Sequence, residues 1–295
     1  MRKSINPISE ATEMKLFAGE KLLVIVGLVG FALAAGIALY ISLYGSVILP
    51  EGDVERAFSF NAAIAMFILS IAAIIPVSGL NSRKRRNVRW FFIPATLYAY
   101  GIETIQHFRG INPRFSREGS IIDNIAGALF GIDSLLIIVV TALFAIPFFR
   151  RRRTNERPLV VLGIRYAFVS TMIAFAAGLW MIVVQGRYTG AAGNLIVLHG
   201  LGFHALQALP LLGWLLERAH SDVQRARRII HIGGIFWSIS ILLIGLQTAL
   251  GRPVFEWTSL PLLAGVALIV WLATFVTAGL ELLRSTKVSE TPHPL

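Results

Sequence analysis

The sequence contains no cysteine. Disulfides, thiolate metal sites, iron–sulfur clusters and covalent attachment of c-type haem are therefore excluded. Histidine and carboxylate side chains remain as the strong metal ligands available to this chain.

Charged residues are also scarce. They make up 15% of the 295 residues, whereas an ordinary soluble domain has about 25%. Hydrophobic residues reach 56%, so the polar side chains are too few to cover a soluble fold. The composition excludes soluble, nucleic-acid-binding and disordered proteins and predicts a protein whose partner is the lipid bilayer.

The apolar residues form long blocks of a length that spans a bilayer as a helix, about 20 residues. No connecting segment is long enough for a soluble domain. The sequence therefore predicts an all-α, polytopic helical membrane protein with about eight transmembrane helices. A single membrane domain would cover residues 21–283, between a short segment at 1–20 and a tail at 284–295. The blocks lie at residues 21–44, 57–80, 90–108, 120–149, 159–185, 192–216, 229–250 and 259–283.

The basic residues alternate between the two sides of these blocks. The net charge is +11, and most lysines and arginines fall before the first block, in every second loop and in the tail. Because basic residues favour the cytoplasmic side, this pattern places both termini in the cytoplasm. It predicts a multi-pass protein of a bacterial cytoplasmic membrane. The arginines on the opposite, outer side are Arg56, Arg109, Arg114, Arg117, Arg187 and Arg252.

Three of the outer arginines share one loop, at residues 109–117. This departure from the orientation rule indicates a local role for them. They would pair with nearby carboxylates, bind anionic headgroups, or hold a small anionic ligand at the outer face.

Ionisable side chains inside the spans are a second unusual feature, because each costs several kcal/mol in a bilayer unless it is paired or hydrated. Glu103 and His107 lie four residues apart in the outer half of block 90–108 and share one helix face. Asp133 lies near the middle of block 120–149. These positions predict a polar cavity that opens toward the outside.

Block 192–216 adds two histidines and an amide. His199 lies in its outer third, and His204 and Gln207 lie near mid-membrane. At 100° per residue, Gln207 falls between the two imidazoles, so all three side chains can edge one broad face.

This set of side chains predicts a bound haem or divalent transition metal with a redox or enzymatic role. His107 and His199 would ligate a haem from opposite sides, and Arg109 and Arg114 would hold its propionates. For a metal without haem, the ligands would come from Glu103, His107, His199 and His204. Gln207 would orient those ligands, and Glu103 and Asp133 are the candidate catalytic groups.

Two alternatives remain open. Intramembrane acids and histidines also serve proton- or cation-coupled transporters of small molecules. Alternatively, the polar groups only join helices, and the protein is a scaffold or sensor without catalysis. The sequence contains no P-loop, no HExxH motif and no GxSxG motif, and it does not determine the oligomeric state.

A short internal similarity favours the transporter. The segment Gly101-Ile102-Glu103-Thr104 resembles Gly245-Leu246-Gln247-Thr248 at an offset of 144 residues. Duplication of four helices would produce such a pattern, as in some transporters.

The stretches from Tyr100 to Phe115 and from His199 to Pro210 resemble an uncharacterised group of bacterial integral membrane proteins. The resemblance covers about a tenth of the chain. It implies a bacterial membrane protein and implies no activity.

Overall fold

The computed structural model describes residues 16–150 and 157–290. Each of the eight predicted blocks lies on one α-helix, which confirms the all-α polytopic membrane fold. The α-helices of the described residues are α1 (Lys21–Tyr44), α2 (Val54–Ile74), α3 (Ser82–Phe108), α4 (Ile121–Phe149), α5 (Pro158–Val183), α6 (Leu195–Arg218), α7 (Val223–Ala249) and α8 (Ser259–Glu290). The short elements are β1 (Val47–Ile48), β2 (Gly52–Asp53), β3 (Tyr188–Thr189), β4 (Gly193–Asn194) and the 3₁₀ helix η1 (Ile75–Ser78).

Seven of these helices are long and apolar enough to cross a membrane. The exception is α3, which has basic residues in its first two turns and Glu103, Gln106 and His107 in its last two. A crossing by α3, and hence the count of eight spans, stays a prediction, as does the cytoplasmic location of the termini.

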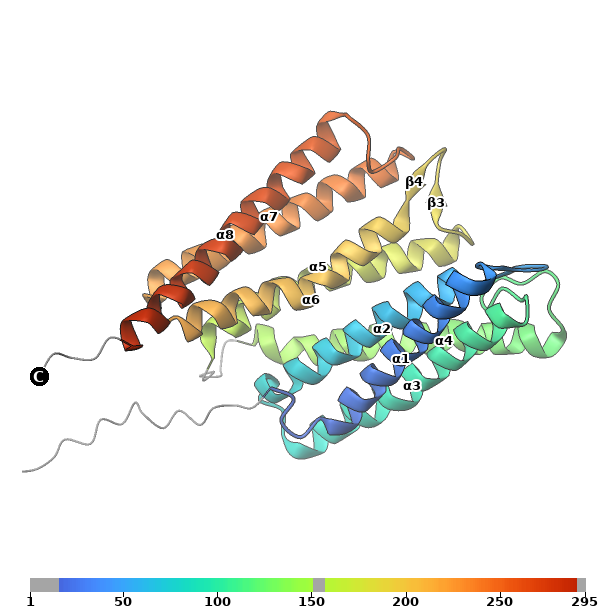
Figure 1. Cartoon of the computed structure of the whole chain (residues 1–295), viewed down its shortest axis with the longest axis horizontal. Coiled ribbons are helices and arrows are strands. Elements are labelled where there is room, and N and C mark those ends of the chain that lie inside the picture. Colours follow the sequence, from blue (N-terminus) through green and yellow to red (C-terminus); the bar gives the residue numbers. More distant parts are fainter. Residues whose placement is uncertain (1–15, 151–156, 291–295) are drawn as a thin grey trace, which may run out of the picture.

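The helices alternate in direction, so all connections lie at two ends of the molecule (Figure 1). We call the end where α1, α3, α5 and α7 begin the basic end. The opposite end has the antiparallel hairpins β1–β2 and β3–β4 and is called the hairpin end. The hairpin end is the predicted outer side.

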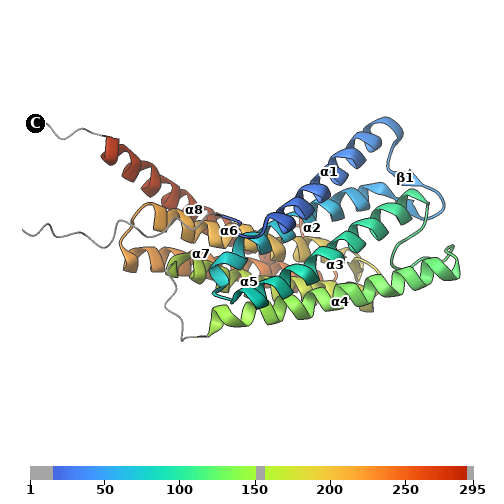
Figure 2. The ribbon, with the colours of Figure 1, turned by 90° about the horizontal axis from the view of Figure 1, so that it is seen from below.

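Close helix contacts come from small residues. α5 and α6 have the most extensive contact of all helix pairs, followed by α1 and α2. Gly163 lies against the backbone of Leu209, and Gly202 lies against Ala174. Figure 2 shows α4 along one edge of the molecule, away from α1 and α8. It contacts α3 and α5 and thereby joins the two halves of the chain.

The two halves repeat the same order of elements: helix, hairpin, helix, helix, helix. Gly52–Asp53 and Gly193–Asn194 are the second strands of their hairpins, at an offset of 141 residues. The helices that follow begin at Val54 and Leu195, again at an offset of 141. The structure therefore contains a four-plus-four repeat.

The repeat extends into the connections at the hairpin end. Gly110 and Gly251 each follow the third helix of their half, with φ of 74° and 69°. Their carbonyls accept equivalent hydrogen bonds, from the N–H of Glu51 at 2.8 Å and of Ala192 at 2.9 Å. Glycine is suited to both positions because other residues disfavour positive φ.

The register of the repeat differs from the one that the sequence similarity indicated. The sequence pairs Gly101 with Gly245, at an offset of 144, whereas the structure pairs Gln106 with Gln247, at an offset of 141. The Gln106 and Gln247 carbonyls accept equivalent backbone hydrogen bonds five residues later in the chain. The predicted register is wrong by three residues because helix ends and turns, not a short sequence similarity, set the equivalence.

Candidate functional site: a buried ion-pair cluster at the hairpin end

The outer arginines have carboxylate partners within the chain. Arg109 Nη1 lies 2.6 Å from Asp123 Oδ1 and donates to Gln106 Oε1 at 2.8 Å. Gln106 Nε2 donates to the same Asp123 oxygen at 2.9 Å. Asp123 also forms a capping box with Ser120 at the start of α4. These contacts favour the first of the three predicted roles, pairing with local carboxylates.

The second half of the chain repeats this arrangement. Gln247 Nε2 donates to Glu256 Oε2 at 2.7 Å, and Arg252 Nη2 donates to Glu256 Oε1 at 2.9 Å. The hydrogen bond from Arg252, with that from Gln247, lowers the pKa of the Glu256 carboxyl. Each half therefore ends its third helix with a glutamine, an arginine and an acid in contact.

Glu103 is the centre of a more deeply buried cluster. Its side chain is 1% exposed. Arg114 contacts both of its oxygens, with Nη2 at 2.9 Å from Oε2 and Nη1 at 3.1 Å from Oε1. Of these two contacts, the one from Nη1 to Oε1 is a hydrogen bond, and the one between Nη2 and Oε2 is an ion-pair contact without hydrogen-bond geometry. The pair joins a loop at the hairpin end to the buried face of α3.

Arg114 also brings several helices together. Its guanidinium carbon lies 5.2 Å from the ring centroid of Phe60 on α2 and 5.0 Å from that of Phe130 on α4. With the ion pair to Glu103 on α3, these contacts bring α2, α3 and α4 together around one cation, which a linear sequence does not show.

His107 has a group of the same chain beside each ring nitrogen. Its Nδ1 accepts a hydrogen bond from the Asp53 N–H at 3.1 Å. Its Nε2 lies 3.4 Å from Glu103 Oε1, without hydrogen-bond geometry. An imidazole that accepts at Nδ1 has its proton at Nε2, facing the carboxylate. A metal or haem iron at His107 would have to displace one of these neighbours.

Residues 109–120, which we call the outer loop, are tied down by a second acid. Glu51, between β1 and β2, accepts hydrogen bonds from the Ser116 hydroxyl at 2.5 Å, the Arg117 N–H at 2.8 Å and the Asn112 N–H at 3.3 Å. These bonds, the one from Ser116 most strongly, lower the pKa of the Glu51 carboxyl. The outer loop is thus held by two acids: by Glu51, between β1 and β2, and by Glu103 of α3 through Arg114.

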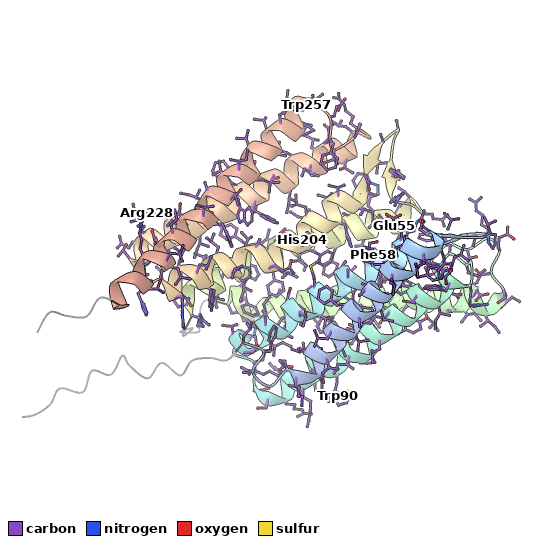
Figure 3. The ribbon with its side chains drawn as sticks, viewed as in Figure 1. Glu55, Phe58, Trp90, His204, Arg228 and Trp257 are labelled. Carbon is purple, nitrogen blue, oxygen red and sulfur yellow. The ribbon has the colours of Figure 1, made fainter. Side chains whose placement is uncertain are left out.

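The residues of α6 make separate contacts. His199 Nδ1 is 2.7 Å from the Ala174 carbonyl of α5, and its ring packs edge-on against Phe203. His204 is exposed, midway along α6 in Figure 3. Its Nδ1 lies 3.4 Å from Gln207 Oε1, and Gln207 Nε2 donates to Ser70 of α2 at 2.5 Å. Gln207 therefore links the two halves of the chain.

Asp133 is half-buried on α4, and its Oδ2 has no hydrogen-bond partner among the described residues. Its charge acts on Tyr98 of α3, whose hydroxyl donates to the Ala126 carbonyl at 2.7 Å. No contact in the described part of the chain joins Asp133 to Glu103.

The predicted site residues thus divide into groups. Glu103, His107 and Arg114 form one cluster, Arg109 belongs to the neighbouring acid–glutamine contact, and His204 pairs with Gln207. Within residues 16–150 and 157–290, no group of three or more histidines and acids is placed to hold a metal ion. The predicted roles of these residues in haem or metal binding stay predictions.

Sequence reasoning missed Glu51 and the aromatic pair Phe60 and Phe130. Glu51 has no motif around it, and it reaches the outer loop only because a short hairpin turns it toward that loop. The two phenylalanines are ordinary apolar residues of their spans, and their role depends on where Arg114 lies.

The arrangement has a definite chemical capacity. The ion pair of Glu103 with Arg114 attaches the outer loop to a buried carboxylate of α3. Loss of this ion pair would therefore remove one of the attachments of the loop to acids of the chain. Comparisons with protein-family models, with curated proteins and with solved structures find no match for this chain.

Proposed function

We propose that this protein is a proton-coupled carrier of a small molecule in a bacterial cytoplasmic membrane. Glu103 is the proton-sensitive group, and Arg114 with the outer loop closes the hairpin end. The observation that carries the proposal is the ion pair between Arg114 and the fully buried Glu103, with one hydrogen bond from Arg114 Nη1 to Glu103 Oε1. It connects a loop at the predicted outer face to an acid inside the helix bundle.

Proton uptake by Glu103 would remove the negative charge that holds Arg114. Loss of this partner leaves the Arg114 guanidinium, whose side chain is 37% exposed, to be solvated by water. We therefore expect Arg114 and the outer loop to move toward water. Protonation at one group therefore opens or closes access to the bundle.

The four-plus-four repeat supports a carrier. Parallel repeats that rock against each other give alternating access in several transporter folds. Here the contacts between halves are concentrated at α4–α5 and α2–α6, where Gln207 meets Ser70. Contacts within each half are far more extensive. The weak connection between the halves suits relative motion.

The test uses protein reconstituted in vesicles that enclose a pH-sensitive dye. The probe is the low-molecular-mass fraction of a bacterial extract, added outside and separated into subfractions. We expect at least one subfraction to change the internal pH with wild-type protein and not with Glu103→Gln. Glu118→Gln is the matched control, because Glu118 is an exposed acid of the same outer loop. A wild-type response equal to that of protein-free vesicles in every subfraction contradicts the carrier.

A second candidate is a haem or divalent transition metal with a redox or enzymatic role. It is supported by His199, whose Nδ1 is placed to donate to the Ala174 carbonyl. Metal-bound histidines are commonly oriented in this way, with Nε2 as the ligand atom. His107, His204 and Glu103 are the further ligands proposed, and Arg109 and Arg114 would hold anionic groups of the cofactor.

A UV–visible spectrum of the purified protein, oxidised and reduced, separates the two candidates. A Soret band that shifts on reduction and disappears in His199→Ala supports haem. Stoichiometric zinc, copper or iron in a colourless sample supports a metal centre. A protein that is colourless and metal-free and that also moves no protons would support the remaining alternative. In that case the polar groups only join helices, as in a scaffold or sensor.

A further inference from the structure

A cleft of about 510 Å³ lies at the basic end, between the residues before α1 and the first two turns of α3. Its lining is strongly basic: four of its residues are arginines and one is an acid. The side chains that matter are Glu20, Ser82, Arg83, Arg85, Arg86 and Arg89.

Two of the arginines build the walls of the cleft. Arg89 donates to both oxygens of Glu20, at 2.8 and 3.0 Å, and neutralises that buried acid. Arg85 donates to the carbonyls of Leu80 and Pro76, at 3.0 and 2.9 Å. These bonds fix the connection between η1 and α3 and leave no free carboxylate in the cleft.

The other two arginines are available to a ligand. Arg83 and Arg86 are exposed and have no hydrogen bond or ion pair within the described ranges. They flank the first turn of α3, where Asn81 Oδ1 accepts from the Lys84 N–H at 2.9 Å. The N–H groups of Ser82 and Arg83 are left free, at the positive end of the helix.

We propose that this cleft binds a phosphate group. Its lining includes donors that suit a phosphate: two guanidinium groups and the Ser82 hydroxyl, beside the N–H groups of the first turn of α3. Phosphate oxygens accept such bonds and prefer helix N-termini. The volume of the cleft exceeds that of a single phosphate and accommodates the attached part of a larger molecule.

The level of the cleft in the bilayer adds a second argument. Trp90, the residue after Arg89, is 59% exposed and points away from the bundle (Figure 3). Exposed tryptophans on membrane helices lie at the headgroup level. The cleft is therefore at the depth of phospholipid phosphates, on the side that the charge pattern predicts to be cytoplasmic. The phosphate belongs either to an anionic lipid or to a soluble molecule.

The experiment measures the melting temperature of delipidated full-length protein in a neutral detergent. The probes are phosphatidylglycerol, phosphatidylcholine and inorganic phosphate. The test variant is Arg83→Gln with Arg86→Gln. The matched control is Arg227→Gln with Arg228→Gln, which removes the same charge from two exposed arginines near the start of α7, also at the basic end (Figure 3 labels Arg228).

We expect phosphatidylglycerol to raise the melting temperature of wild type and of the control, with phosphatidylcholine ineffective. The test variant should bind at least about tenfold more weakly than the control, because it removes two charge-assisted donors from the cleft, whereas the control removes charge outside it. Stabilisation by inorganic phosphate that equals the lipid effect assigns the site to a soluble phosphate. Equal responses of the two double variants, or no response of wild type to any phosphate, overturn the proposal. Melting of the variants without ligand verifies that they fold.

Discussion

Gln106 and Gln247 occupy the same position in the two halves of the chain and share two kinds of contact. Each backbone carbonyl accepts the N–H five residues later, and each side-chain amide donates to an acid, Asp123 or Glu256. An arginine three or five residues after the glutamine also contacts that acid. Each half therefore has a glutamine, an arginine and an acid in contact at the hairpin end, and the additional pair of Glu103 and Arg114 belongs to the first half.

Substitution of Gln106 should lower the stability of the folded protein more than the change in side-chain volume implies. Gln106→Leu removes one hydrogen bond to the buried Asp123 carboxylate, which costs about 1–3 kcal/mol. The free energy of unfolding, measured by denaturant titration in detergent, checks this. Gln224→Leu is the control, since Gln224 is exposed at the start of α7. Equal effects of the two substitutions contradict a role for the Gln106 contacts.

The Glu103–Arg114 pair should show strong coupling in a double-mutant cycle. Arg114→Ala should destabilise the protein by about 3–5 kcal/mol, because it leaves the buried Glu103 carboxylate without its partner. Glu103→Ala should cost less, because the Arg114 side chain is 37% exposed and water solvates its charge. The double variant should lose much less than the sum of the two. Additive losses would show that the two side chains act independently and would remove the basis of the proposed gate.

The outer loop should loosen in acid. The pKa of Glu51 lies below its ordinary value of 4.5 in the folded protein. Its hydrogen bonds to the outer loop therefore stabilise the fold fully above pH 4.5. This stabilisation is lost as the pH falls through the lowered pKa. Hydrogen exchange of residues 112–117 should accelerate between pH 5 and pH 3, relative to unstructured peptides at the same pH. In Glu51→Gln, the acceleration should be already present at neutral pH and should change little in acid.

Close packing of α5 and α6 should make Gly163 intolerant of a methyl group. A Cβ at Gly163 would overlap the backbone of Leu209, whereas a Cβ at Gly200 would meet no atom within 4 Å. Gly163→Ala should destabilise the protein by about 1–3 kcal/mol, the cost typical of overpacking. Gly200→Ala should be neutral or stabilising, because alanine favours helix. A loss of stability at Gly200 equal to that at Gly163 would contradict the packing of this helix pair.

The hydropathy of the amino-acid sequence was sufficient to locate the helices. Runs of about 20 apolar residues have few alternatives to a helix in a bilayer, because every backbone polar group needs an internal partner. The sequence also identified Glu103, His107 and Arg114 as unusual, since ionisable side chains are rare in such a chain.

The contacts of these ionisable side chains depend on the tertiary structure. The ion pair of Arg114 with Glu103, the contacts of Glu51 with the outer loop and the register of the repeat depend on the paths of short hairpins and loops. These paths follow from turn geometry and side-chain packing, which hydropathy does not encode. A span is determined by its own composition, whereas an ion pair is determined by where two distant segments meet.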